Sequence, residues 1–218
     1  TVLAVVGNMV SCNLPAFGVQ GTTSEVTSSS VWTALPAVAV GQAVASLLNA
    51  VGFEVVSEYY INDAGRQMKL LGASVTARYR ELKGQPAGFP EDGYHGAYIT
   101  ALAERLTPAL DAQRGLSAEQ LEERCRSLAY QELLSLIRED LKAFGIEISS
   151  WFSEASLLSS QAVERVLDEL KSRQLVFEQD GAWWFRSSDF GDEKDRVVKK
   201  QDGEYTYLAS DIAYHRDK

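Results

Sequence analysis

Tyr207, Asp211 and His215 follow one another at intervals of four residues near the end of the sequence. Residues four positions apart lie on one face of an α-helix, so a helix here would place a phenol, a carboxylate and an imidazole side by side. A carboxylate in such a position can accept two parallel hydrogen bonds from a guanidinium group. On spacing alone, the simpler interpretation is that Asp211 caps the helix and Tyr207 packs in the core.

The elements around these residues decide where they would lie. We expect a strand from Tyr205 to Leu208 and a helix that begins near Ser210. Open α/β sheets bind their ligands at the carboxyl ends of their strands. The three side chains would therefore face this edge of a sheet.

Other chemistries are poorly supported. Asp189-Phe190-Gly191 matches a magnesium-binding motif of protein kinases, but the glycine-rich loop and the His-Arg-Asp motif that kinases also need are missing. We interpret Asp189–Arg196 as a charged loop that joins two hairpins. With only two histidines in the chain, Ser/His/Asp or Cys/His catalysis is not indicated. Cys12 and Cys125 lack the spacing of a zinc site or a disulfide framework, and Cys125 is expected to pack on an apolar helix face.

Composition indicates a globular chain without a membrane span or a basic secretory leader, so we expect a cytoplasmic protein. There are 21 Lys and Arg residues against 30 Asp and Glu residues, giving a net charge of −9. This charge gives no general attraction to nucleic acid, although RNA contacts could lie on another part of a longer chain.

Helical and strand patterns alternate from Gly41 onward, which indicates an α/β fold. Asp180-Gly181 and Asp202-Gly203 are hairpin turn signals between alternating runs. The expected helices and strands, in chain order, are helix 43–50, strand 53–60, helix 65–82, helix 98–106, a long helix to 144 opened by a capping box at Ser117, strand 146–152, a helix capped by Ser160, and hairpins 176–186 and 196–208.

The first 39 residues differ from the rest because Glu25 is their only charged residue. Gly18–Ser30 has no sustained periodicity and is expected to be a loop. We therefore place a boundary near Val40, between an atypical segment of residues 1–39 and a second region of residues 40–218.

Five stretches of the second region resemble, in the same order, stretches of bacterial-type arginyl-tRNA synthetases: Glu58–Gln67, Phe89–Gly96, Trp151–Glu154, Trp184–Arg196 and Thr206–His215. The resemblance implies a class I synthetase fold, in which a Rossmann-like nucleotide-binding α/β domain, incomplete here, is split by a connective insertion that contains the hairpins. It also implies that Tyr207 and Asp211 hold the arginine side chain, with Asp211 pairing with the guanidinium, in place of the capping interpretation. His215 is a further candidate on the same face.

The implied reaction has two steps. Arginine is activated with ATP and Mg²⁺ to arginyl-adenylate, and the arginyl group then passes to the 3′ end of tRNA(Arg). A monomer is expected from the family. Its His-x-Gly-His signature for ATP would fall at Val31–Ala34, where no histidine occurs, and the second, lysine-rich signature is not reached. Residues 1–39 are then either an out-of-frame or mispredicted translation, or the chain is a non-catalytic arginine-binding protein.

Overall fold

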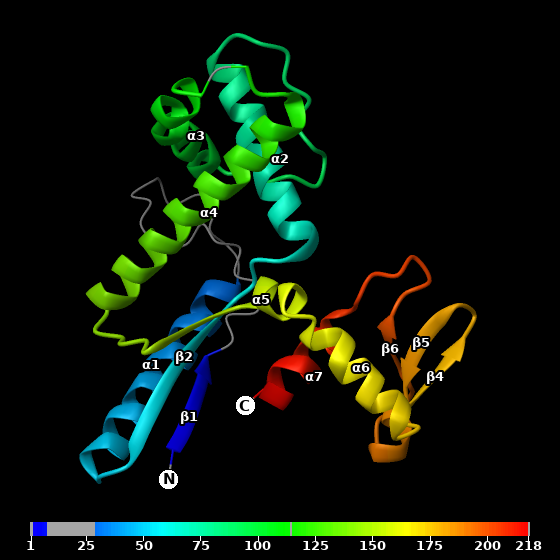
Figure 1. Ribbon diagram of the computed structural model, residues 1–218. Coiled ribbons are helices and arrows are strands. Elements are labelled where there is room, and N and C mark those ends of the chain that lie inside the picture. The colour runs from blue at the N-terminus through cyan, green and yellow to red at the C-terminus, as the bar shows by residue number, and fades with distance from the viewer. Residues whose placement is uncertain (1, 8–28, 114, 218) are drawn as a thin grey trace. The chain divides into compact units, whose positions relative to one another are not determined.

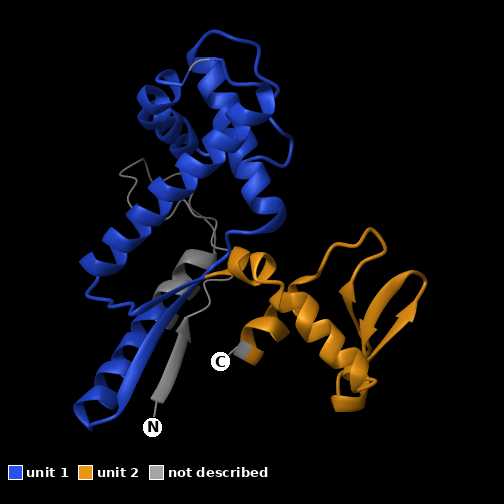
Figure 2. Cartoon of the chain, viewed as in Figure 1, with its two compact units in different colours: residues 1–152 blue, residues 153–218 orange. Residues whose placement is uncertain are grey.

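The computed structural model describes residues 2–7, 29–113 and 115–217 (Figure 1). The chain forms two compact units, Thr1–Phe152 and Ser153–Lys218, which are coloured separately in Figure 2. Within the described residues, no helix is both long enough and apolar enough to cross a membrane.

The first unit contains a parallel β-α-β arrangement. Strand β1 (Val2–Gly7) leads to helix α1 (Ser29–Ala50), which returns to strand β2 (Glu54–Ile61). β1 and β2 pair in parallel, from Val2 opposite Glu54 to Gly7 opposite Tyr59. The short strand β3 (Ser150–Ser153) joins the other edge of β2, so the sheet order is β1-β2-β3. A crossover helix between parallel strands is the basic unit of nucleotide-binding α/β folds.

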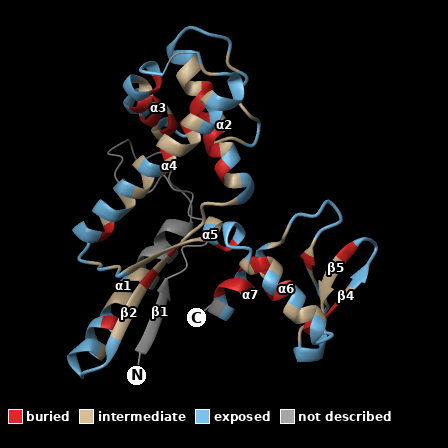
Figure 3. Ribbon diagram, in the orientation of Figure 1, coloured by how far each residue is buried: buried red, intermediate tan, exposed pale blue. Residues whose placement is uncertain are grey.

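Three helices lie between β2 and β3 in the sequence and pack on one another. They are α2 (Gly65–Leu82), α3 (Ala97–Asp111) and α4 (Ala118–Ala143). Their apolar faces form one buried core, which is red in Figure 3. The core residues are Met68, Leu71, Val75, Ile99, Leu102, Ala103, Leu106, Leu110, Cys125 and Ala129.

Local sequence explains how α2 and α4 form and approach. Ser117 and Gln120 make the reciprocal hydrogen bonds of a capping box at the start of α4. Gly72 lets the two helices come close, because a Cβ atom there would lie 2.9 Å from the Cβ of Arg126. The burial of Cys125 confirms its expected packing role, whereas Cys12 lies outside the described residues.

The second unit combines helices with a small antiparallel sheet. Its elements are α5 (Glu154–Ser159), α6 (Ala162–Ser172), β4 (Val176–Gln179), β5 (Ala182–Phe185), the 3₁₀ turn η1 (Ser187–Phe190), β6 (Arg196–Lys199) and α7 (Tyr207–Asp217). The strands are ordered β4-β5-β6. The first hairpin is confirmed, with Asp180 and Gly181 at φ values of 52° and 74° in its turn.

Several expected boundaries were wrong. The strand expected at Tyr205–Leu208 does not form, since Tyr205 makes only an isolated bridge to Lys199 and α7 begins at Tyr207. The second hairpin is therefore replaced by pairing of β6 with β5. Ser160 does not cap α6; the N-cap is Gln161 in a left-handed conformation, without a side-chain cap bond.

Two further differences concern the first half of the chain and β3. α1 begins at Ser29 and runs through Val40 without a break, so the last two residues of the expected loop are helical. Most of that loop lies outside the described residues. β3 is shorter than the strand expected at 146–152, and the short helix α5 was not anticipated.

Candidate functional site

Tyr207, Asp211 and His215 all lie on helix α7, where they occupy one exposed face. Tyr207 is 66% exposed. The opposite face of α7 is buried through Ala209, Ala213 and Tyr214, which pack within the second unit. The four-residue spacing thus places the three polar side chains on one face of α7. That face is exposed, and the strand Tyr205–Leu208 whose carboxyl end they were expected to face does not form, which corrects the expected position at a sheet edge.

The start of α7 is fixed by Thr206. Its hydroxyl donates a 2.7 Å hydrogen bond to the carbonyl of Val197 on β6. Its own carbonyl accepts hydrogen bonds from the backbone amides of Ala209 and Ser210. The first turn of the helix is therefore tied to the sheet, which sets the direction of the face that carries Tyr207 and Asp211.

The end of α7 is held by an ion pair. Arg216 Nε lies 2.6 Å from Glu169 Oε2 on α6, and Glu169 also pairs with Arg173. These groups are partly exposed, so the pairs orient the helices more than they stabilise them. The ring of His215 lies 5.2 Å, centroid to centroid, from that of Tyr214.

The carboxylate of Asp211 is available for a ligand. Within the described part of the chain, no hydrogen bond or ion pair engages this carboxylate, and α7 has no acidic residue in its first turn. The capping alternative is therefore wrong for Asp211, and the exposure of Tyr207 rules out the core-packing alternative for that residue. An exposed carboxylate beside a phenol ring can bind a flat cation through two hydrogen bonds and a ring face.

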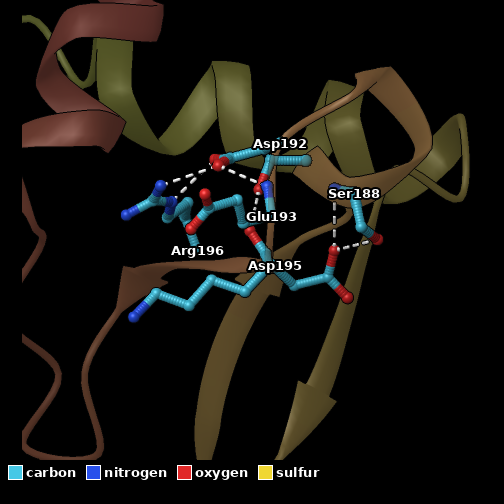
Figure 4. Close-up of polar contacts among 7 residues, drawn as sticks. Ser188, Asp192, Glu193, Asp195 and Arg196 are labelled. Carbon is cyan, nitrogen blue, oxygen red and sulfur yellow. Dashed lines mark hydrogen bonds and ion pairs between the residues drawn. The ribbon is translucent and has the colours of Figure 1, made fainter.

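The loop that contains Asp189-Phe190-Gly191, here called the Asp-Phe-Gly loop, has several internal polar contacts, and Figure 4 shows those of Ser188, Asp192, Asp195 and Arg196. Arg196 donates two 2.7 Å hydrogen bonds to the carboxylate of Asp192. The hydroxyl of Ser188 donates a 2.7 Å hydrogen bond to Asp195. The Arg196 guanidinium lowers the pKa of Asp192 to about 2. The loop connects β5 and β6 within one sheet, rather than two separate hairpins.

The first unit places other family-like residues at the end of β2. Asp63 follows this strand and accepts a 3.0 Å hydrogen bond from the Tyr130 hydroxyl on α4. Arg66, in the first turn of α2, pairs with Asp92. These contacts fix the segment that joins the sheet to the helices.

Glu58 is a buried carboxylate that the sequence reading did not single out. It is 3% exposed on β2 and accepts a 2.9 Å hydrogen bond from the Ser150 hydroxyl. A charged residue in the middle of β2, directly before Tyr59 and Tyr60, was the signal that could have identified it. Among the described residues, no group of three or more His, Cys, Asp or Glu side chains is suited to hold a metal ion.

Comparison with known proteins agrees with this architecture. Residues 33–218 match the family described as tRNA synthetases class I (R), catalytic domain. The parallel β-α-β unit fits the nucleotide-binding domain of this class. A Campylobacter jejuni crystal structure assigned as an arginyl-tRNA synthetase superposes with a TM-score of 0.74 at 35% identity, covering 83% of this chain and 40% of that one.

The curated relatives of the chain are also arginine–tRNA ligases. Arginine–tRNA ligase of Nitratidesulfovibrio vulgaris is 49% identical over 180 residues, which are 83% of this chain and 33% of that protein. The enzyme of Shouchella clausii is 46% identical over 181 residues. The chain belongs to the arginyl-tRNA synthetase family, and it spans about a third of the length of the curated relatives it matches.

Proposed function

We propose that this chain is part of an arginine–tRNA ligase and that the exposed face of α7 binds the arginine side chain. The observation that carries the proposal is the position of Asp211, a carboxylate without an ion pair among the described residues, one helical turn after Tyr207. Asp211 would accept two hydrogen bonds from the guanidinium, and the Tyr207 ring would lie against it. His215, one turn further on, borders the same face.

The proposed reaction is that of the family. The carboxylate of arginine attacks the α-phosphorus of ATP, which forms arginyl-adenylate and releases pyrophosphate. The arginyl group then passes to the 3′ end of tRNA(Arg). Mg²⁺ would accompany ATP; since no group of three or more His, Cys, Asp or Glu side chains among the described residues is suited to hold a metal ion, we assign it no ligand. The contribution of α7 is to position arginine, which lowers the entropic barrier to attack.

We further propose that the chain as written has little ligase activity. The family's His-x-Gly-His signature would fall at Val31–Ala34, which contains no histidine. An out-of-frame or mispredicted origin of residues 1–39 accounts for this difference and for their near-absence of charge. Translation of the neighbouring coding DNA in all frames tests this origin, because it requires the signature to appear upstream in one of them.

Arginine-dependent exchange of pyrophosphate into ATP tests the activity itself. We expect the purified chain to show little exchange, and rates near those of an intact ligase would contradict this expectation. A non-catalytic arginine-binding protein is the alternative, but the named ligases among the relatives favour the family reaction over it.

Calorimetry with arginine tests the binding face separately from catalysis. We expect arginine to bind the purified chain, and citrulline, which has the same shape without the positive charge, to bind far more weakly. Asp211→Asn removes the charge while keeping the size, and a lost charge-assisted pair corresponds to a decrease in affinity of about tenfold or more. Asp168→Asn on α6, whose side chain is 76% exposed, is the matched control.

The outcomes are distinct. Loss of arginine binding in the Asp211 variant, with normal binding in the Asp168 variant, supports the assignment. If the wild-type chain and the Asp211 variant bind arginine with equal affinity, Asp211 does not bind the guanidinium and the assignment is wrong. Circular dichroism of both variants establishes that any loss does not come from unfolding.

A further inference from the structure

His215 lies one helical turn after Asp211 on the exposed face of α7. The Cβ atoms of residues four positions apart on a helix are separated by about 5–6 Å. An acidic residue four positions before a basic one is also the favourable order for an ion pair along a helix. A protonated His215 can therefore reach the Asp211 carboxylate, which is the group that we assign to the guanidinium of arginine.

The charged groups packed around α7 are bound to other partners. α5, α6 and β6 pack against this helix. The charged residues on α5 and β6, together with the α6 residue that is ion-paired to α7, are Glu154, Arg196, Lys199 and Glu169. The Glu169 carboxylate is occupied by Arg216 and Arg173. Arg196 is paired with Asp192. Asp211 is therefore the carboxylate, one turn away, that remains for His215.

The charge of the imidazole changes what this face offers to a cation. Beside a neutral imidazole, the Asp211 carboxylate can accept two hydrogen bonds from a guanidinium. An imidazolium would compete for the same carboxylate and would also repel the guanidinium across a few ångströms. Histidine is the side chain that normally changes its charge between pH 5 and pH 8.

We propose that the protonation state of His215 controls arginine binding at Asp211: the neutral imidazole permits binding, and the imidazolium weakens it. This inference rests on the proposed arginine-binding face and adds the regulation of that face by pH. Carboxylates and phenols normally titrate near pH 4 and pH 10, outside this range, and the guanidinium of arginine stays charged throughout it. The chain contains only two histidines, and the other one, His95, lies in the first unit.

Calorimetry with arginine at about pH 5.5 and about pH 8 tests the proposal. We expect the wild-type chain to bind arginine about three- to tenfold more weakly at the lower pH. His215→Gln is neutral at both pH values and should remove the difference. His215→Lys is charged at both and should bind arginine weakly at both. His95→Gln is the matched control and should keep the pH dependence of the wild-type chain.

The outcomes separate this proposal from the arginine site itself. Arginine binding that is equal at the two pH values, or a pH dependence that persists in His215→Gln, overturns the control by His215 and leaves the arginine site standing. Absence of arginine binding at both pH values contradicts the arginine site, and the control by His215 falls with it. Circular dichroism at both pH values establishes that any loss of binding does not come from unfolding.

Titration of the histidine ring protons by nuclear magnetic resonance tests the coupling directly. Saturating arginine should move the titration of His215 to lower pH, because coupling between two binding events is reciprocal, and should leave that of His95 unchanged. Without arginine, Asp211→Asn should also move the titration of His215 to lower pH, because the imidazolium loses its partner. A titration of His215 that neither change affects overturns the proposal.

Discussion

The hydroxyl of Thr206 and the carbonyl of Val197 are joined by a 2.7 Å hydrogen bond, which ties the residue before α7 to strand β6. Thr206 precedes the helix whose exposed face carries Tyr207 and Asp211. A single side chain in the second unit thus fixes where the candidate binding face begins. Removal of the Thr206 hydroxyl should therefore make the start of α7 less ordered and lower the stability of the second unit.

Substitution of Thr206 tests this role. Thr206→Val keeps the shape but removes the donor, and we expect it to lower the free energy of unfolding by about 1 kcal/mol. Thr206→Ser keeps the hydroxyl and should remain close to wild type. Urea denaturation followed by tryptophan fluorescence measures the difference, since Trp183 and Trp184 lie in the same unit. Identical midpoints for the two variants would show that the hydrogen bond contributes nothing.

Alkaline pH should destabilise the helical part of the first unit. Burial and the neighbouring carboxylates of Asp111 and Asp63 raise the pKa values of Tyr79 and Tyr130 from 10.0 to about 12. The unfolded chain ionises these phenols first, so the stability they contribute is complete below pH 10 and is lost as the pH rises toward 12. Urea denaturation at several pH values between 10 and 12 measures how steeply the free energy of unfolding falls with pH. Replacing both tyrosines with Phe should make this fall with pH shallower. An unchanged fall would contradict the raised pKa values of the two tyrosines.

The core between α2, α3 and α4 should be sensitive to loss of volume. Leu110 is 1% exposed, and Leu110→Ala is expected to cost about 2–5 kcal/mol through lost burial and the cavity left behind. Leu82→Ala is the control, because Leu82 is 43% exposed and should contribute little. Thermal unfolding of both variants measures the contrast. Similar losses of stability in the two variants would contradict a position of Leu110 in the core.

The first hairpin depends on a left-handed glycine. Gly181 has φ of +74°, so Gly181→Ala should destabilise the second unit by about 1–2 kcal/mol. Gly88→Ala is a matched control, because Gly88 lacks a positive φ and an added Cβ there would meet nothing within 4 Å. Chemical denaturation distinguishes them. A Gly181 variant as stable as the Gly88 variant would contradict the turn conformation.

Local patterns predicted the elements whose signals lie within one segment. The spacing of Met68, Leu71 and Val75 predicted α2 with the bounds 65–82 that the structure has, and the Ser117 capping box predicted the start of α4. Asp180-Gly181 predicted the first hairpin because this dipeptide suits the turn directly. The intervals between Tyr207, Asp211 and His215 predicted that the three side chains point in the same direction, but with Tyr207 on a strand, whereas the structure places all three on helix α7.

Long-range pairing explains what the sequence did not reveal. Tyr205–Leu208 has the composition of a strand, but the bond from Thr206 to β6 and the packing of Ala209 and Ala213 favour a helix from Tyr207. β6 pairs with β5 across the Asp-Phe-Gly loop, which no local pattern indicates. The burial of Glu58 depends likewise on Ser150, 92 residues away.

Contact between arginine and Tyr207 is the most direct test of the central claim. With isotope-labelled arginine bound to the chain, nuclear Overhauser effects should connect the arginine δ-methylene protons to the Tyr207 ring protons, and Asp211→Asn should remove them. Bound arginine that shows such effects only to other residues would contradict the assignment of the α7 face, as would the absence of binding.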